Sequence, residues 1–371
     1  MGTSAVDLSV LDGVRAVECA WGVAAAFCGH ALAELGADVV SIRGADAPSG
    51  EVSALGALKR HVRADLRTPE GVRDVERLVA RADVFIEERA PLGWPAGDPL
   101  GPRLAACQPA LLSVCLSPFG LTGPRAEASA YPLNVYHASG YAQQIPRDAL
   151  WPEYLVRPPV QAGGRWGEAQ AGLLAAVATV ACLIRADGPA GGVIDCSKQD
   201  ALVSMNWTEI VRYLNEGRTV TRLEPWVTFV GGVLPASDGY VQITIMEDHQ
   251  WRSAMELLGD PEWARAPELS TQPGRLGAWQ DVAKRLANET RRHSRTDLYR
   301  RGQALGLPIA PVFTLGDVLA DESLERRGVW RTVTTPSGEQ LRLPRWSTSV
   351  RHRAPGAPPR PAAVTPEAGR P

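Results

Sequence analysis

An apolar segment near the middle of the chain constrains the fold more than any other feature. Ala171–Ile184 consists of Ala, Gly, Leu, Val, Cys and Ile with a single Thr. A helix formed here is apolar on every side and therefore belongs inside a large core. We expect it to be too short to cross a bilayer. The segment thus predicts a globular domain that encloses this helix.

One acidic residue, Glu168, lies in the expected first turn of this helix. The helix dipole and the unpaired backbone amides of a first turn both stabilise an anion. A carboxylate that is held and aimed in this way can act as a nucleophile or as a base. An acidic residue in a first turn is also a common helix cap. The sequence alone leaves both interpretations open.

Composition and charge narrow the class of protein. The 371 residues allow one large and one small domain, and 39 Lys and Arg nearly balance 41 Asp and Glu. Without a basic run, a nucleic-acid partner is not expected. No leader-type segment and no apolar stretch of membrane-spanning length is evident. We therefore expect a cytoplasmic protein without a membrane partner.

Cysteine and histidine spacing gives no support for a metal site. The six cysteines are widely spaced, and the six histidines form no pair at helical ligand spacing with an adjacent acid. We expect free thiols in a reducing compartment and no metal cofactor.

Strands and helices alternate in the first part of the chain, which predicts a parallel sheet covered on both faces. We assign residues 1–224 to this large α/β domain. The expected strands are Val14–Glu18, Asp38–Ile42, Val84–Ile86, Leu111–Leu116 and Val193–Ser197, with helices at Ala25–Leu35 and after Thr68-Pro69.

A second region has a different pattern. Tyr240–Ile245 alternates like a strand of an open sheet, and Asp248–Leu258 and Ser294–Ala304 have helical patterns. We assign residues 225–330 to a small α+β domain. Residues 331–371 are expected to return to the large domain and to end in a Pro-rich tail.

Three common site motifs are missing. The first expected strand is followed by Ala20–Ala24, which lacks the spaced glycines of a dinucleotide site. Ser117 is not flanked by the glycines of a nucleophile elbow. The chain also has no phosphate-binding loop that ends in Gly-Lys-Ser or Gly-Lys-Thr.

Several segments between Leu11 and about Pro344 together resemble one known family. The most specific are Lys59-Arg60, the Asp-Leu-x-Thr-Pro-Glu-Gly pattern at Asp65–Gly71, and the Ser-x-Phe-Gly-x-Thr-Gly-Pro pattern at Ser117–Pro124. The chain resembles the family III CoA-transferases, a group with formyl-CoA transferases, carnitine CoA-transferases and alpha-methylacyl-CoA racemases. Further matching segments are Leu11–Val17, Phe27–Val40, Ser139-Gly140, Asp195–Asp200, Asp238–Val241 and Pro308–Val318.

The resemblance implies a Rossmann-like large domain, a small domain and an interlocked dimer. It also implies transfer of CoA between carboxylic acids, with an acyl-CoA and a free acid as substrates. In the family an Asp attacks the acyl-CoA to form a mixed anhydride, and counting back from Gly172 places Glu168 at that position. The longer Glu moves the carboxylate by about one ångström, a displacement that can cost about a hundredfold in rate.

The resemblance also supplies the remaining candidate residues. Glu88 replaces a neutral Asn of the family and brings an anion toward the CoA phosphates, which Arg89 can offset. The glycine-free stretch Thr219–Trp226 replaces a glycine-rich loop, and we expect its Arg222 and Trp226 to shape the pocket. The candidates for CoA contact are Trp21, Gly22, Val23, Ala24, Lys59, Arg60, Glu88 and Arg89.

Two residues are candidate auxiliary groups, and other functions stay open. The catalytic His of the racemases falls at Tyr131, with Asn134 the nearer match. One alternative is an isomerase, lyase or dehydratase in which Glu168 is a general base and Tyr131 an acid. Another is a non-catalytic subunit that pairs with an active homologue. The partner in a dimer is then either a second copy or that homologue.

Overall fold

A six-stranded sheet forms the centre of the large domain. Its strand order is β3-β2-β1-β4-β5-β6, and every neighbouring pair is parallel, an order typical of Rossmann-like sheets. The expected parallel sheet is therefore confirmed. The strands are β1 (Arg15–Cys19), β2 (Asp38–Arg43), β3 (Arg60–Arg63), β4 (Val84–Glu88), β5 (Leu112–Ser117) and β6 (Gly192–Ser197). The computed structural model describes residues 9–44, 54–88, 100–145, 158–184, 191–219, 228–334, 338 and 340–345.

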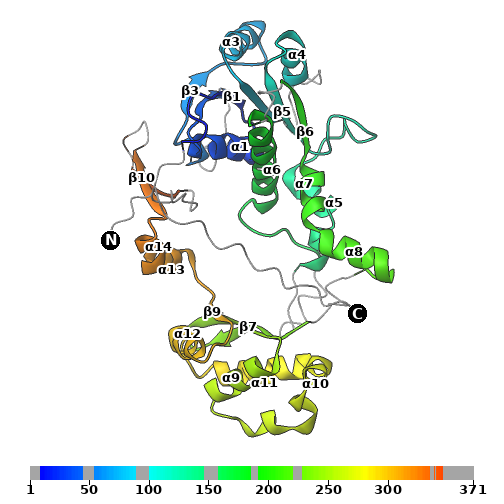
Figure 1. The fold of residues 1–371 in the computed structure, drawn as a ribbon, viewed down its shortest axis with the longest axis vertical. Coiled ribbons are helices and arrows are strands. Elements are labelled where there is room, and N and C mark those ends of the chain that lie inside the picture. Colours follow the sequence, from blue (N-terminus) through cyan, green and yellow to red (C-terminus); the bar gives the residue numbers. More distant parts are fainter. Residues whose placement is uncertain are drawn as a thin grey trace, which may run out of the picture.

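Helices cover both faces of this sheet (Figure 1). Successive strand residues point to opposite faces, so Ala16 belongs to the core under α1 (Val23–Glu34) and α6 (Trp166–Leu183). Its neighbour Val17 belongs to the core under α3 (Pro69–Val79) and α4 (Leu100–Cys107). The remaining helices of this part are α5 (Pro132–Ala138), α7 (Lys198–Met205) and α8 (Trp207–Glu216).

The two helices on the first face pack closely because their contact residues are small. Ala171, Ala175 and Ala176 of α6 are buried against α1. A side chain on Gly172 would collide with the carbonyl oxygen of Ala24. The apolar composition of α6 therefore sets its distance from α1, and with it the position of the first turn of each helix.

The apolar helix α6 is longer than its apolar segment 171–184, because it includes the first turn with Glu168. It covers 18 residues with a mean hydropathy of 1.3, and 39% of them are buried. The expectation that no stretch reaches membrane-spanning length is therefore wrong, because by length and composition this one helix of the described residues does. A core helix of a globular protein meets the same criteria, and α6 packs on α1 and the sheet.

The Asp-Leu-x-Thr-Pro-Glu-Gly segment is a structural turn that starts α3. Thr68 Oγ1 accepts a hydrogen bond from the Gly71 backbone N–H at 3.0 Å and donates one to the Asp65 carbonyl oxygen at 2.8 Å. A side chain on Gly71 would collide with that same carbonyl oxygen. The pattern therefore reflects a helix cap and a close backbone approach.

A second core lies at the other end of the molecule in Figure 1. It is built on an antiparallel sheet of order β7-β8-β9, as expected for a small α+β domain. The predicted boundaries at residues 224 and 330 stay predictions. The elements are β7 (Val230–Ala236), β8 (Gly239–Ile245), β9 (Ile309–Pro311), α9 (Asp248–Leu257), α10 (Gln272–Gly277), α11 (Trp279–Thr290) and α12 (Arg295–Ala304).

The chain then returns to the large domain. After α13 (Leu315–Ala320) and α14 (Glu322–Arg326), strands β10 (Trp330–Thr334) and β11 (Gln340–Pro344) form an antiparallel hairpin. Arg331 of β10 forms an ion pair with Glu34 at the end of α1. The expected Pro-rich tail lies outside the described residues.

Candidate active site

The candidate site lies at the carboxyl edge of the parallel sheet. Strand β4 ends at Glu88, and β6 ends at Ser197, directly before Lys198. Helix α1 starts just beyond the end of β1 and brings its first turn to the same edge. In open α/β sheets, ligands bind outside the carboxyl ends of the strands.

Glu88 is buried against the first turn of α1. Its Oε2 accepts a hydrogen bond from the Ala25 backbone N–H at 2.8 Å, and its Oε1 accepts one from Lys198 Nζ. Any side chain on Gly22, the residue before α1, would collide with this carboxylate. Glu88 therefore occupies the positive end of α1 as an internal anion. Lys198 neutralises the Glu88 carboxylate. The expectation that Glu88 turns an anion toward the CoA phosphates is therefore not met in this conformation.

Glu168 lies in the first turn of α6, as predicted, and its side chain is 6% exposed. Arg165 Nη1 lies 3.4 Å from Glu168 Oε2, and Lys198 Nζ lies 3.9 Å from Glu168 Oε1. The ammonium of Lys198 thus lies between the Glu88 and Glu168 carboxylates. A cation this close favours the ionised form of a carboxylate.

A cluster of aromatic side chains packs at the start of α6. The ring centroid of Tyr141 lies 6.2 Å from the ring centroid of Tyr136 and 5.0 Å from that of Trp166. Burial raises the pKa of Tyr141. The Tyr136 hydroxyl is buried and has no hydrogen-bond partner among the described residues. Because a side chain on Gly167 would lie 3.5 Å from the Tyr136 ring, this phenol packs close to the turn that carries Glu168.

The segment after β1 lies at the same edge. Trp21 is half-buried, and a side chain on Gly44 would come within 3.1 Å of its indole. Val23 and Ala24 are buried in the first turn of α1. Gly22 and the start of α1 thus place backbone groups beside the Glu88 carboxylate, whereas the Trp21 ring packs near Gly44, just after β2. Their contact with CoA stays a prediction.

Lys59 points into the interior. Its Nζ donates hydrogen bonds to Glu18 Oε2 at 2.5 Å and to the Ala26 carbonyl oxygen at 2.8 Å, and Ser41 donates to the same carboxylate at 2.9 Å. Burial raises the pKa of Glu18 and lowers that of Lys59, and each partner partly offsets the effect on the other. In this conformation the ammonium binds Glu18 rather than facing a phosphate.

Arg60 lies at the opposite edge of the sheet from Glu168. It is the first residue of β3, is exposed, and forms a bidentate pair with Asp38 through hydrogen bonds of 2.9 and 2.6 Å. The structure therefore does not bring Arg60 together with Glu88, Lys198 and Glu168.

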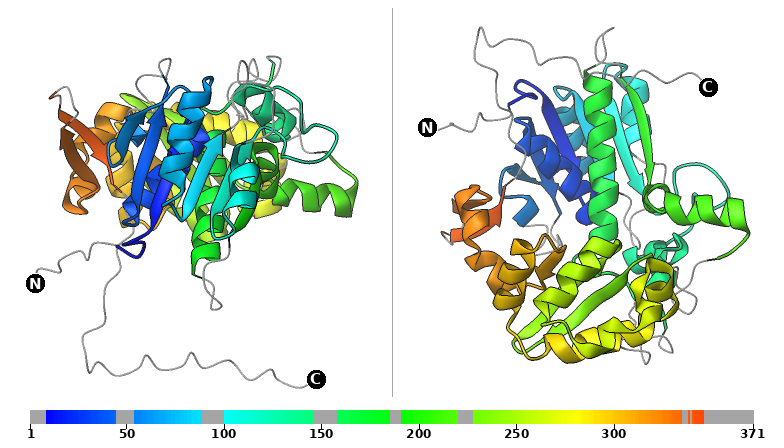
Figure 2. Two further views of the ribbon diagram at one scale, coloured as in Figure 1. Left: turned by 90° about the horizontal axis from the view of Figure 1, so that it is seen from above. Right: turned by 60° about the horizontal axis from the view of Figure 1, so that its bottom comes forward.

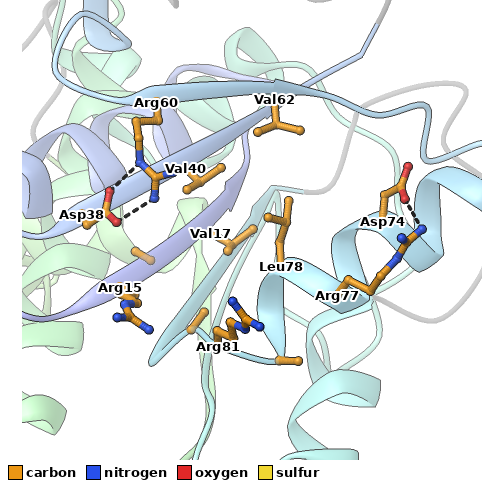
Figure 3. Close-up of a pocket in the computed structure, with 13 residues that line it drawn as sticks. Arg15, Val17, Asp38, Val40, Arg60, Val62, Asp74, Arg77, Leu78 and Arg81 are labelled. Carbon is orange, nitrogen blue, oxygen red and sulfur yellow. Dashed lines mark hydrogen bonds and ion pairs between the residues drawn. The ribbon is translucent and has the colours of Figure 1, made fainter.

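A groove of about 910 Å³ also lies at this amino edge (Figure 3). Its floor is apolar, and arginines surround it, two of them paired with Asp38 and Asp74. Because it is at the amino ends of β1, β2 and β3, it is separate from the cluster around Glu168. The labelled apolar residues are Val17, Val40, Val62 and Leu78, and the labelled arginines are Arg15, Arg60, Arg77 and Arg81.

The two auxiliary candidates lie at the start of α5. Asn134 Oδ1 accepts a hydrogen bond from the Tyr131 backbone N–H at 2.9 Å, so Asn134 caps this helix. Tyr131 is 52% exposed. Their proposed chemical roles stay predictions. Arg89, Arg222 and Trp226 lie outside the described residues.

The sequence interpretation missed Lys198 as a site residue. Two signals could have found it. Lys198 directly follows a strand predicted to end at this edge, and the 39 basic residues of the chain include only three lysines. As for metals, the described residues contain no group of three or more His, Cys, Asp or Glu side chains that could hold an ion.

The sequence and the fold match those of a known enzyme family. The sequence model of CoA-transferase family III matches residues 11–370. The chain therefore belongs to CoA-transferase family III, which confirms the resemblance.

Relatives of the chain include both transferases and a racemase. The succinate–glutarate CoA-transferase of Agrobacterium fabrum is 26% identical, with 86% of this chain and 84% of the relative covered. The alpha-methylacyl-CoA racemase of Mus musculus is 27% identical, with 91% and 85% covered. The crystal structure of a CAIB/BAIF family protein from Brucella suis has a TM-score of 0.75 and 27% identity, with 93% of each chain covered.

We predict that Lys59 stabilises the fold and that the adjacent Arg60 does not. Lys59→Met leaves the Glu18 carboxylate buried without its cation, which should lower the free energy of unfolding by about 3–5 kcal/mol. Arg60→Met removes an exposed pair and should cost less than about 1 kcal/mol. Urea denaturation of the two variants measures this difference.

A Glu18→Gln/Lys59→Met double variant is the control for this prediction, because it removes both charges together. It should recover most of the lost stability. Equal, small losses in Lys59→Met and Arg60→Met, with weakened CoA binding in the former, would instead assign Lys59 to the CoA site.

Proposed function

We propose that this chain is a CoA-transferase in which the Glu168 carboxylate accepts the acyl group. The carboxylate attacks the thioester carbonyl carbon, a C–O bond forms, and the C–S bond breaks with departure of the CoA thiolate. The product is a mixed anhydride on Glu168. The thiolate then attacks the Glu168 side of the anhydride, which releases the donor acid and leaves CoA as a thioester on Glu168. A second acid takes up the CoA by the same steps in reverse.

One observation carries this proposal: a buried carboxylate lies at the carboxyl edge of a family III fold, with an ammonium 3.9 Å away. The side chain of Glu168 is largely enclosed, so its charge is screened little by water, and the ion pair acts at short range. A carboxylate held in position loses little entropy when the thioester approaches.

The names of the relatives suggest the first substrates to test. They include a succinate–glutarate CoA-transferase and a succinyl-CoA–D-citramalate CoA-transferase, the latter from Chloroflexus aurantiacus and 27% identical to this chain. We propose short dicarboxylic acids and their CoA thioesters as the substrate class, with CoA itself as a substrate rather than a resident cofactor.

We predict that an acyl-CoA donor modifies Glu168 and no other carboxylate. The protein is incubated with succinyl-CoA or glutaryl-CoA, trapped with hydroxylamine or borohydride, digested, and analysed by mass spectrometry. Glu168→Gln should give no adduct, because an amide is a poor nucleophile. Glu168→Asp should keep the chemistry but withdraw the carboxylate by about one ångström, which should slow acylation by about a hundredfold.

The control for folding is thermal unfolding of each variant. An unmodified Glu168 in a protein that exchanges an α-proton of the substrate would contradict the transferase proposal and favour general-base chemistry. An adduct on another carboxylate would contradict the assigned nucleophile.

We further propose that the chain works as a homodimer through an apolar face. Leu174 and Val177 of α6 and Val193 of the edge strand β6 are 44–58% exposed. Helix α8 extends away from the body in Figures 1 and 2, and its Trp207 and Leu214 are 65% and 74% exposed. An apolar surface of this kind marks a protein contact in a water-soluble chain.

We predict that the purified protein sediments as a dimer at micromolar concentration. Trp207→Glu/Leu214→Glu places two charges on this face and should give a monomer in analytical ultracentrifugation, because burying unpaired charges is costly. Tyr299→Glu, on α12 of the small domain, is the matched control and should stay dimeric. A protein that is monomeric alone and dimeric only with a homologue would contradict the homodimer and support a heteromer, as one relative is named a beta subunit.

A further inference from the structure

The use of lysine in this chain is selective. The 39 basic residues include only Lys59, Lys198 and Lys284 as lysines. Two of the three are buried and bind carboxylates, Lys59 with Glu18 and Lys198 with Glu88. An ammonium is a compact charge on a flexible stem, whereas a guanidinium is a broad planar fork. Two of the three lysines therefore serve as small interior cations.

The Lys198 ammonium has two carboxylate neighbours of different kinds. Glu88 is fixed, because its other oxygen is bound to the Ala25 N–H at 2.8 Å. Glu168 is the reacting group of the proposed function, and its Oε1 is 3.9 Å from Lys198 Nζ. Resting on that proposed function, we propose that Lys198 is a positioning residue that keeps Glu168 ionised for attack, while Glu88 keeps Lys198 charged and in place throughout the reaction.

The charge changes of the reaction explain why both carboxylates are needed. Before acylation, Glu168 carries a negative charge, which the nearby ammonium stabilises. When the C–O bond forms and the C–S bond breaks, that charge leaves with the CoA thiolate, and no proton is taken up or released. A buried ammonium that had only Glu168 as a partner would then be left unpaired, which is strongly unfavourable. The hydrogen bond to Glu88 prevents this.

The position of Lys198 is set by the fold. Lys198 is the first residue of α7, and the preceding Ser197 caps that helix by accepting a hydrogen bond from the Asp200 N–H at 3.1 Å. Ser197 is also the last residue of β6, paired with Ser117 of β5. Strand and cap together fix the start of the lysine side chain at the carboxyl edge.

The other titratable groups found near Glu168 in the described part of the chain do not provide the same charge. Arg165 is half-exposed, so water screens its pairing with Glu168. Tyr136 presents a hydroxyl group near this turn. The Cys196 thiol, which donates to the Ala171 carbonyl oxygen of α6, has its pKa raised to about 11 by burial. On α1, burial likewise raises the pKa of Cys28. Among the contacts that the described residues show, Lys198 is thus a buried cation close to Glu168.

The test measures the rate of single-turnover acylation of Glu168 against pH in four variants: Lys198→Met, Glu88→Gln, the double variant, and Lys284→Met as the matched control. Lys284 is an exposed lysine of α11 in the small domain. Thermal unfolding of each variant separates effects on folding from effects on the reaction.

Lys198→Met should slow acylation by about a hundredfold, the range found for loss of one charge-stabilising group. The acid limb of its pH profile should move up by about one unit, because Glu168 ionises less readily without the cation. Glu88→Gln should move that limb down, because a nearby anion is removed. Lys284→Met should match the wild type in both respects.

The double variant separates positioning from a structural role. Glu88→Gln/Lys198→Met removes both buried charges, so it should recover the folding stability that Lys198→Met alone loses, yet acylate as slowly as Lys198→Met. Recovery of both stability and acylation would overturn the proposal and leave the pair a purely structural one. An unmoved acid limb in Lys198→Met would also overturn it.

Failure of the proposed function is distinguishable from failure of this inference. If wild type and Lys284→Met both form no adduct on Glu168, the transferase proposal fails. The effect of Lys198 on the ionisation of Glu168 is then measured without turnover, by carbon-13 NMR titration of the Glu168 carboxyl. Its signal is identified as the one that is lost in Glu168→Gln. A titration midpoint that rises in Lys198→Met supports the inference, and an unchanged midpoint overturns it.

Discussion

The ammonium group of Lys198 lies between two buried carboxylates, and the candidate site depends on that placement. Each carboxylate reaches it from a different element: Glu88 from the end of β4 and Glu168 from the first turn of α6. Charges of this kind are costly to bury alone and are stable only as a hydrogen-bonded group. The three side chains therefore form one unit, and the elements that carry them must meet at the same edge of the sheet.

The packing of α1 makes that meeting possible. Gly172 lets α6 approach the Ala24 carbonyl, and Gly22 leaves room for the Glu88 carboxylate at the start of α1. Two buried Glu–Lys pairs flank this first turn. Glu88 accepts from the Ala25 N–H, and Lys59, which binds Glu18, donates to the Ala26 carbonyl oxygen. The same short segment thus connects an interior ion pair, which supports the fold, with a second pair beside the carboxylate assigned to chemistry. This arrangement therefore requires a residue without a side chain at Gly22 and at Gly172.

Local signals in the sequence were sufficient for most of the architecture. Runs of apolar residues predict five of the six strands of the parallel sheet within one or two residues, with β3 the exception, Thr68-Pro69 marks the start of α3, and Glu168 lies in the first turn of α6 as expected. The pairing of Lys198 with Glu88 was not predictable in this way, because the two residues are 110 positions apart and meet only when β4 and β6 join one sheet. Lys59 and Arg60 are adjacent and both cationic, yet one is enclosed and the other exposed, because each pairs with a carboxylate far away in the sequence, Glu18 and Asp38 respectively. The apolar segment 171–184 underestimates the length of α6, because the helix also includes the first turn with Glu168, and the whole helix reaches membrane-spanning length.

The central claim is that the Glu168 carboxylate exchanges oxygen with the substrates. In a mixed anhydride formed from an acceptor acid, the bridging oxygen comes from that acid, and it stays on the protein when the thiolate takes the acyl group. The most direct measurement is turnover with an acceptor acid labelled with oxygen-18 in its carboxylate, followed by mass spectrometry of the peptide that contains Glu168. The account predicts label in Glu168, none in Glu88, and none in either residue when the donor acyl-CoA is omitted. Complete turnover that leaves Glu168 unlabelled would contradict it.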